Sequence, residues 1–409
     1  MTPFVVGLVT LAARADAIDP DSLRGKVMTG YQGWFRCPSD AAGMGWMHWS
    51  RDSSRVAPET LTFEMWPDVS DYSPDELCAV PGFTHPDGNP ASLFSSDNAA
   101  TVLRHFEWMR DYGLEGAWLQ RFVVGLPGGP ADAWYDSTLR VMSHVRAAAS
   151  ATDRVWALSY DTAAMPPEGI YDAVVADWTR LVDSGVIADP RYVHEGGRPV
   201  VQVWGFYPGN EHNRITAATG HQLVDFFSAP GPYQAFLVGG GTWTWRTETD
   251  SEWQRLYRRF GAYSPWNIGN YSLDEQGVSH ASTHYWEDDR RECEAHGMLW
   301  LPTVYPGFSW DNLTRQPPGS SLIPRRSGAF LWEQFHRLAQ MGVDSVYVAM
   351  FDEVDEGTAI FKVTSSPPTQ AHFVGYEGLP SDGYLRLTGE GIHMLRGERA
   401  LSADIPISP

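Results

Sequence analysis

Residues 345–362 read SVYVAMFDEVDEGTAIFK, and this stretch decides which fold we expect. Its first half alternates aliphatic side chains with aromatic or small ones, which is typical of a buried β-strand. Its second half places four acids in five positions, and they are Asp352, Glu353, Asp355 and Glu356. Like charges this close repel one another unless a site uses them. The stretch therefore predicts a buried strand that ends in an acidic cluster.

Seven similar β-rich runs precede this one, and a helical pattern follows each run. The predicted strands are 26–34, 115–122, 155–162, 199–206, 235–242, 262–269, 298–306 and 345–353. The predicted helices are 98–112, 132–150, 168–185, 211–228, 249–260, 281–296, 328–341 and 383–396. Eight strand–helix units predict an α/β fold, a (β/α)8 TIM barrel. We find no repeat or linker that divides it, so residues 18–409 are expected to form one domain.

Two connections are long for this fold, 36–97 after the first strand and 307–327 after the seventh. Both follow strands and so lie at the C-terminal face of a barrel, where substrates bind. We expect them to form pocket walls. A shorter feature, Gly196-Gly197-Arg198-Pro199, is typical of a hairpin end leading into the fourth strand.

Composition narrows the possible partners. Thirty Lys and Arg face fifty Asp and Glu, a net charge of −20, and no basic run is present. Nucleic acid and anionic membrane surfaces are therefore disfavoured, and no segment has the apolar length of a membrane span. Aromatic residues make up 13% of the chain. Their flat faces suit stacking on sugar rings, although packing in the core accounts for most of them.

The amino terminus and the cysteines bear on location. Residues 1–17 hold a short apolar stretch followed by small-residue sites, a pattern that indicates a signal peptide and a secreted or periplasmic protein. The cysteines are Cys37, Cys78 and Cys293, too widely spaced for a disulfide framework or zinc ribbon. They allow at most one bridge and one free thiol.

The ends of the predicted strands should meet at one mouth of the barrel. The side chains that we expect there to bind substrate are Tyr31, Trp34, Gln120, Arg121, Tyr160, Asp161, Trp204, Trp266, Tyr305 and Asp352. Aromatic, amide and acid groups of this kind are typical of a carbohydrate site. For any single one of them, ordinary packing is at least as common, so the hypothesis depends on their convergence.

Glycosidic cleavage needs two carboxyls beside one bond, and Glu353 and Glu356 are the candidates at the end of the eighth strand. Gly357 allows a tight turn that brings Glu356 back toward the same cavity. A calcium loop fits less well, because position 363, where its bidentate Glu should fall, is Val. The glycine-rich stretches 125–129 and 239–242 lack nucleotide fingerprints, so we expect no metal and no cofactor.

The motif Asp352-Glu353-Val354-Asp355-Glu356-Gly357-Thr358 resembles the N-E-W-x-E-G-T motif of glycoside hydrolase family 99, the endo-α-mannosidases and endo-α-mannanases. PTVYPGFSWDN (302–312) is similar to that family's P-T-V-x-P-G-Y segment, and GYQGWF (30–35) lies where the family has its first-strand Tyr/Trp cluster. The chain looks still more like a set of family 71/99-like proteins, often exported and often without an assigned substrate.

The resemblance implies roles for both glutamates. Glu353 would deprotonate the sugar 2-hydroxyl, which attacks its own anomeric carbon, and Glu356 would protonate the leaving oxygen and later activate water. This implies a retaining glycoside hydrolase acting on a 1,2-trans bond, as in α-mannosides or β-glucosides. Asp352 and Val354 replace the motif's Asn and Trp, so mannan specificity does not carry over.

Other functions remain open at this point. An inverting, family 71-like α-glucanase would share the fold, and a non-catalytic carbohydrate-binding barrel would use the aromatic ring alone. A metal-dependent hydrolase fits least, because histidines are not grouped. His48, in the long first connection, could line a subsite, though a packed loop histidine is commoner.

Overall fold

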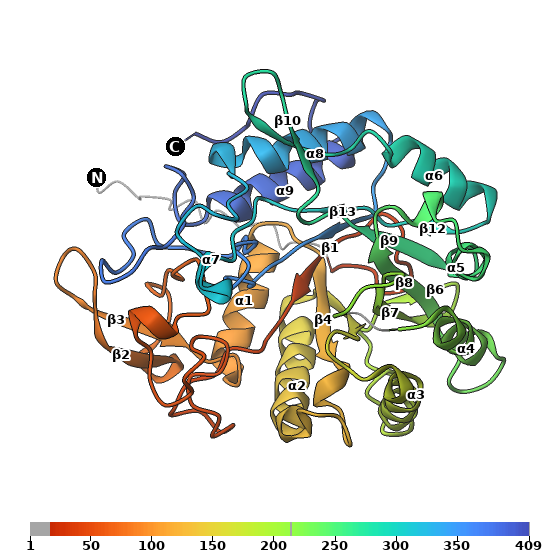
Figure 1. Cartoon of the computed structure of the whole chain (residues 1–409), viewed down its shortest axis with the longest axis horizontal. Coiled ribbons are helices and arrows are strands. Elements are labelled where there is room, and N and C mark those ends of the chain that lie inside the picture. The colour runs from red at the N-terminus through yellow and green to blue at the C-terminus, as the bar shows by residue number, and fades with distance from the viewer. Residues whose placement is uncertain (1–16, 213–214, 409) are drawn as a thin grey trace, which may run out of the picture.

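The computed structural model describes residues 17–212 and 215–408, and it has the predicted (β/α)8 barrel (Figure 1). The barrel strands are β1 (Val27–Tyr31), β4 (Gly116–Phe122), β5 (Val155–Asp161), β7 (Arg198–Phe206), β8 (Phe236–Thr242), β9 (Ala262–Trp266), β12 (Leu299–Trp300), β13 (Thr303–Val304) and β14 (Val346–Val348). They are parallel in the order β12-β9-β8-β7-β5-β4-β1-β14-β13. Because β12 and β13 are two halves of one segment, their pairing with β9 and β14 closes the ring.

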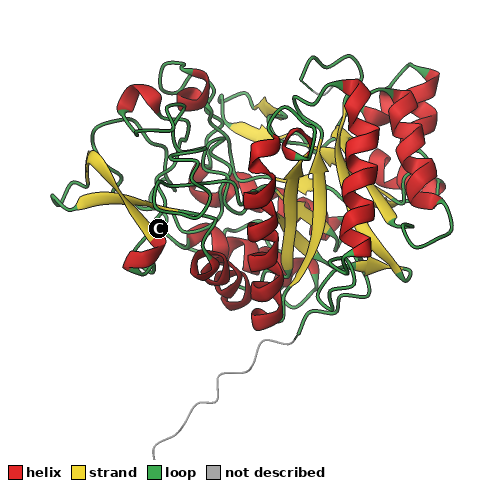
Figure 2. Ribbon diagram, turned by 90° about the horizontal axis from the view of Figure 1, so that it is seen from below, coloured by secondary structure: helices red, strands yellow, loops and turns green. Residues whose placement is uncertain are grey.

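Helices surround the strands, as Figure 2 shows from a second direction. They are α1 (Ala99–Asp111), α2 (Tyr135–Thr152), α3 (Pro167–Asp183), α4 (Ala217–Ser228), α5 (Ser251–Tyr257), α6 (Trp286–Ala295), α8 (Ala329–Gln340) and α9 (Gly383–Leu395). Each lies within or close to a predicted helix. The side chains of Asn98 and Asp250 cap α1 and α5 by accepting hydrogen bonds from backbone N–H groups of the first turn. The eight predicted strand–helix units are therefore confirmed.

The seventh and eighth strands are shorter than predicted. Pro302 has no N–H to donate and separates β12 from β13, so the segment bonds to β9 before it and to β14 after it. The β14 ladder stops at Val348, but the chain stays attached to its neighbours. Ala349 N–H donates to the Val304 carbonyl, and Phe351 N–H donates to Gly30. The acidic motif therefore begins on backbone that is fixed to both adjoining strands.

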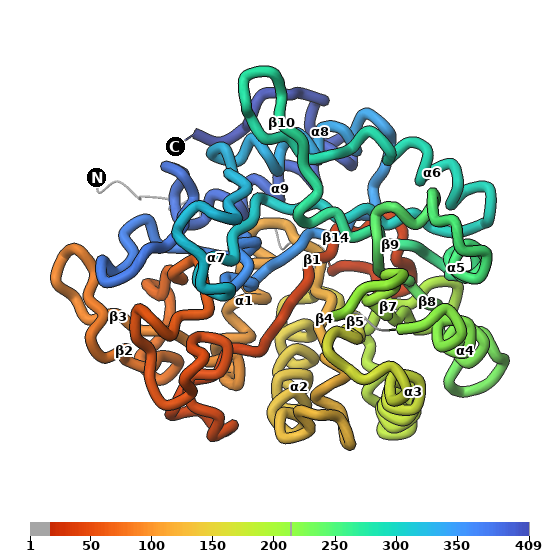
Figure 3. Tube along the Cα trace, in the orientation of Figure 1, coloured from red at the N-terminus to blue at the C-terminus, as the bar shows by residue number. Residues whose placement is uncertain are grey.

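The connection 36–97 folds into a layer against the barrel (Figure 3). It contains the antiparallel hairpin of β2 (Leu77–Thr84) and β3 (Pro90–Phe94), and a disulfide joins Cys37 to Cys78. Trp49, Phe63 and Trp66 are buried in it. The connection 307–327, with α7 (Asp311–Thr314), packs on this layer through Glu64, which accepts hydrogen bonds from Ser309 Oγ and Asn312 N–H.

The structure also bears on the predicted hairpin, the free cysteine and the predicted signal peptide. The hairpin before the fourth barrel strand is confirmed, because β6 (His194–Glu195) pairs antiparallel with Arg198–Pro199 of β7. A second small hairpin joins β10 (Tyr271–Leu273) and β11 (Ser279–Ala281). Cys293 is a buried free thiol. The predicted signal peptide lies almost wholly outside the described residues.

A helix that crosses a membrane must be both long and apolar. None of the helices in 17–212 and 215–408 is both long and apolar enough to cross a bilayer.

The glycines of β8 make room for bulky neighbours. A Cβ on Gly240 would come within 2.9 Å of the Trp204 ring and 3.1 Å of Gln202 Nε2, and one on Gly239 would come within 2.5 Å of Phe260. Such approaches are closer than a real Cβ tolerates. The stretch 239–242 therefore makes room for bulky side chains on both faces of β8.

Candidate active site

A cavity of about 190 Å³ lies at the C-terminal end of the barrel strands. Its lining residues are Gln32, Trp34, Gln120, Phe122, Asp161, Ala163, Gln202, Trp204, Trp266, Tyr347, Met350, Glu353 and Glu356. Of the side chains predicted to converge on the barrel mouth, Trp34, Gln120, Asp161, Trp204, Trp266, Glu353 and Glu356 line this cavity. The other five do not, and their side chains are hydrogen-bonded to other groups of the protein.

Arg121 and Tyr160 face away from the cavity, toward α3. Arg121 donates to both carboxylate oxygens of Asp177, at 2.6 and 2.7 Å, and the Tyr160 hydroxyl donates to the same group at 2.8 Å. Side chains alternate along a strand, so the neighbours Gln120 and Asp161 point inward and these two point outward. The prediction that Arg121 and Tyr160 line the barrel mouth is wrong.

Tyr31 and Tyr305 are also outside the cavity lining. Tyr31 is fully buried and its hydroxyl hydrogen-bonds His105 Nδ1 at 2.9 Å. The Tyr305 hydroxyl donates to the carbonyl of Asn270 at 3.1 Å, and its ring packs edge-on against Phe330. Both residues belong to the packing around the barrel, where their hydroxyls are already satisfied.

Asp352 is buried and does not line the cavity. Its carboxyl oxygens accept hydrogen bonds from Gln32 N–H at 2.7 Å and Gly33 N–H at 2.9 Å. Burial raises its pKa to about 7, against the opposing effect of these two N–H donors. Asp352 thus fixes the end of the first strand instead of lining the cavity, which corrects its predicted role.

The structure adds six residues that sequence reasoning missed: Gln32, Phe122, Ala163, Gln202, Tyr347 and Met350. Gln120 donates to the Tyr347 hydroxyl at 2.8 Å. Gly30 allows this arrangement, because a Cβ there would come within 2.2 Å of Met350 Sδ and 2.4 Å of the Tyr347 hydroxyl. Strand alternation from Trp204 to Gln202 was the available signal for one of them.

Glu353 is buried and held by two donors. Its carboxyl accepts from Gln32 Nε2 at 2.5 Å and from Thr358 Oγ1 at 2.9 Å. Burial raises its pKa well above the usual value, and the charges of Glu356 and Asp355 act in the same direction. The two donors oppose this, because they stabilise the ionised form. Glu353 is therefore oriented, and its charge depends on its neighbours.

Glu356 is only partly buried, and among the described residues no side-chain donor hydrogen-bonds its carboxyl. Burial raises its pKa to about 7, and Asp355 raises it further. Asp161, across the cavity, also has its pKa raised to about 7, by burial and then by Glu356. The three carboxyls share one small cavity, where burial and like charge favour the retention of protons.

Several polar atoms of the lining are buried without a hydrogen-bond partner. They are Gln32 Oε1, Gln202 Nε2, Trp34 Nε1 and Trp204 Nε1. Unpaired buried donors and acceptors are costly, so their concentration around one cavity indicates a polar ligand. Trp204 packs edge-on to Trp266, with ring centroids 5.4 Å apart, which leaves aromatic surface beside these polar atoms.

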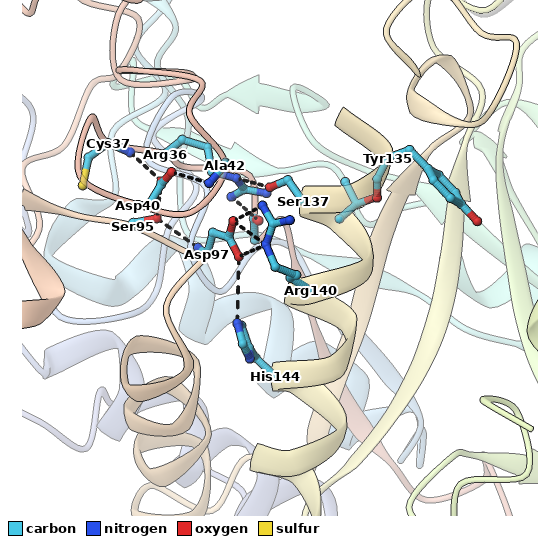
Figure 4. Close-up of polar contacts among 12 residues, drawn as sticks. Arg36, Cys37, Asp40, Ala42, Ser95, Asp97, Tyr135, Ser137, Arg140 and His144 are labelled. Carbon is cyan, nitrogen blue, oxygen red and sulfur yellow. Dashed lines mark hydrogen bonds and ion pairs between the residues drawn. The ribbon is translucent and has the colours of Figure 1, made fainter. Parts of the chain in front are cut away.

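A polar cluster around Arg36 and Asp97 anchors the first connection to α2 (Figure 4). Buried Arg36 donates through Nε to Ser137 Oγ of α2 at 2.6 Å and through Nη1 to the Gly33 carbonyl at 2.9 Å. Nearby, Arg140 of α2 donates to Asp97 at 2.6 Å. These bonds tie both ends of the long connection to one helix, which fixes the position of the cavity wall.

A second, wider cavity of about 690 Å³ adjoins His48. It is lined mainly by residues between 42 and 62, with Trp134 and Leu313. Residues of both long connections therefore line this second cavity, whereas none of them lines the smaller one. His48 stacks on Trp34 with ring centroids 3.9 Å apart, so these two rings stand between the wider cavity and the smaller one.

No group of three or more His, Cys, Asp or Glu side chains within 17–212 and 215–408 has the arrangement of a metal site.

Comparison with known proteins gives similarity at the level of structure. No family model matches the sequence, and no curated protein matches it. The chain is similar to the glycoside hydrolase family 99 endo-α-mannosidase of Bacteroides thetaiotaomicron in complex with bis-tris-propane, with a TM-score of 0.66, 17% identity, and coverage of 93% of this chain and 100% of that one. A second structure of an endo-α-mannosidase from that organism is similar with a TM-score of 0.65 and 15% identity, covering 92% of this chain and 99% of that one. The fold is therefore that of a family 99-like (β/α)8 barrel.

Proposed function

We propose that the protein is a retaining glycoside hydrolase. The observation that carries the proposal is that Glu353 and Glu356 line the same small cavity, together with Trp204 and Trp266. Two carboxyls beside aromatic faces and unpaired amide groups are what cleavage of a glycosidic bond requires. The similarity in fold to an endo-α-mannosidase supports the same class of reaction.

The environments of the two glutamates support different roles. Gln32 and Thr358 donate to Glu353 and favour its ionised form, which suits a base that takes the proton of the sugar 2-hydroxyl. Glu356 is partly exposed to the cavity and has a pKa raised to about 7, which suits a proton donor. In the proposed reaction O2 attacks C1, the C1–O bond breaks, and Glu356 protonates the departing oxygen. Water, deprotonated by Glu356, then attacks C1 and opens the anhydro ring, while Glu353 returns its proton to O2.

This chemistry limits the substrate to 1,2-trans glycosides, because O2 must lie opposite the leaving group. An α-mannoside in a glycan or polysaccharide is the substrate that we propose. The alternatives are an inverting, family 71-like α-glucanase and a non-catalytic carbohydrate-binding barrel. The shared cavity of Glu353 and Glu356 weighs against the binding protein.

The test is a screen of the protein against α-mannans, β-glucans and arabinoxylans, with NMR of the first-formed anomer. A retained anomer from a 1,2-trans substrate supports the proposal, whereas inversion on an α-glucan favours the rival hydrolase. Glu356→Gln should lose most turnover on a substrate with a poor leaving group. Unchanged turnover in that variant would overturn its assignment, and binding of glycans without cleavage would favour the binding protein.

The location belongs to the same proposal. Disulfides persist in oxidising compartments, so the Cys37–Cys78 bridge supports a secreted or periplasmic protein. The test is to produce the protein in an oxidising compartment and in the reducing cytoplasm and to count the free thiols of each product. The count shows in which compartment the Cys37–Cys78 bridge forms.

A further inference from the structure

The side chain of His48 connects the first loop to the acidic motif. Its Nδ1 lies 3.4 Å from Asp355 Oδ2, and its ring stacks on Trp34 with planes 9° apart. Its backbone is fixed as well, because Thr62 Oγ1 donates to the His48 carbonyl at 2.6 Å. His48 also has a positive φ of 64°, a conformation that a bulky residue keeps only when its surroundings hold it. The ring is therefore held in one place.

Asp355 needs such a partner. It lies between Glu353 and Glu356 in the sequence and is almost fully buried. Its Oδ1 has no hydrogen-bond partner. Its Oδ2 faces His48. A buried carboxyl with one contact from another element can turn toward other carboxyls and share a proton with them if that contact is lost.

We propose that His48 is a positioning residue for the acidic motif, holding Asp355 away from Glu353 and Glu356 so that these two form the working pair. This inference rests on the proposed function and adds a residue to its site. His48 acts through Asp355 and need not touch the substrate.

The charged groups around the pair agree with this role. Asp352, Glu353 and Glu356 face Asp355 from its own segment, and Arg36 faces His48 from the first connection. Burial, followed by Arg36, lowers the pKa of His48 to about 3, while burial raises that of Asp355 to about 8. Burial thus disfavours charge on both groups, and the 3.4 Å contact places His48 Nδ1 against Asp355 Oδ2.

The test measures the pKa of Glu356 directly and needs no substrate. Protein labelled with ¹³C at the glutamate side-chain carboxyl is titrated by NMR, and Glu356→Gln assigns the signal. In His48→Phe, which keeps the stacked ring but has no Nδ1, Asp355 is released, and the pKa of Glu356 should shift by about one unit. In an Asp355→Asn background, His48→Phe should cause no further shift of the Glu356 pKa, because the amide cannot ionise.

The control is His393→Phe, on the exposed face of α9, which should leave the Glu356 titration unchanged. His48→Gln, which retains a polar side chain, serves if the Phe variant does not fold. An unchanged Glu356 titration in the His48 variant, or a shift that persists in the double variant, would overturn the proposal. If no glycan is cleaved, the proposed function fails while the titration still decides whether His48 positions Asp355.

Discussion

The side-chain amide of Gln32 donates to the carboxyl of Glu353 across 2.5 Å, joining the end of the first strand to the end of the eighth. At the same time the backbone N–H of Gln32 donates a hydrogen bond to the Asp352 carboxyl at 2.7 Å, which holds the Gln32 backbone in place. The neighbouring acids of the motif therefore have separate tasks. Asp352 fixes the strand that carries Gln32, and Gln32 orients Glu353 within the cavity.

Gln32→Leu should weaken the proposed base. Leucine has a similar size but donates no hydrogen bond, so the ionised form of Glu353 loses a stabilising partner and its pKa rises. We expect the acidic limb of the kcat/KM profile to move up by about one pH unit. Gln276→Leu, at an exposed position in the turn between β10 and β11, is the matched control. A lower rate with no movement of that limb would contradict this role for Gln32.

Arg121→Met should unfold the protein more readily without changing substrate affinity. Asp177 would remain buried without its bidentate partner, at a cost of about 3–5 kcal/mol in the free energy of unfolding. Denaturant titration measures this loss, and the double variant with Asp177→Asn should recover part of it. If KM rose while stability stayed constant, Arg121 would contact the substrate after all.

These residues also show how much of the site the sequence could predict. The strand–helix alternation fixed the eight units and brought the correct strand ends together. It could not show which side chains of each strand point into the barrel, because helices cover the outside and both faces of each strand are buried. Arg121 is therefore as buried as the cavity residues, and its partner Asp177 lies 56 positions away in α3. Gln32 gave no signal, since its role depends on a contact 321 residues along the chain.

The stability of the protein should fall as pH rises from about 4 to about 7. Burial raises the pKa of Asp161 from 3.8 to about 7, so over that range the folded state binds a proton that the unfolded state has released. The free energy of unfolding then decreases with pH. Asp161→Asn should reduce this slope by up to about 1.4 kcal/mol per pH unit.

Thermal unfolding across that pH range measures the effect, with Asp21→Asn at an exposed position as the control. If Asp161→Asn and the control gave the same slope as the native chain, Asp161 would not hold a proton in the folded state.

Trp204→Leu should lower the affinity for a sugar more than it affects folding. The ring lines the cavity beside Trp266 and buries an Nε1 with no hydrogen-bond partner, so both its face and its N–H are available to a ligand. Loss of one aromatic face costs about 1 kcal/mol, a factor of about five in affinity. Trp243→Leu provides the comparison, because that ring is 37% exposed and packs against Tyr285 outside the cavity lining. Isothermal titration of Glu356→Gln protein with the best oligosaccharide from the screen separates the two tryptophans, and equal losses from both substitutions would argue against Trp204 as a sugar platform.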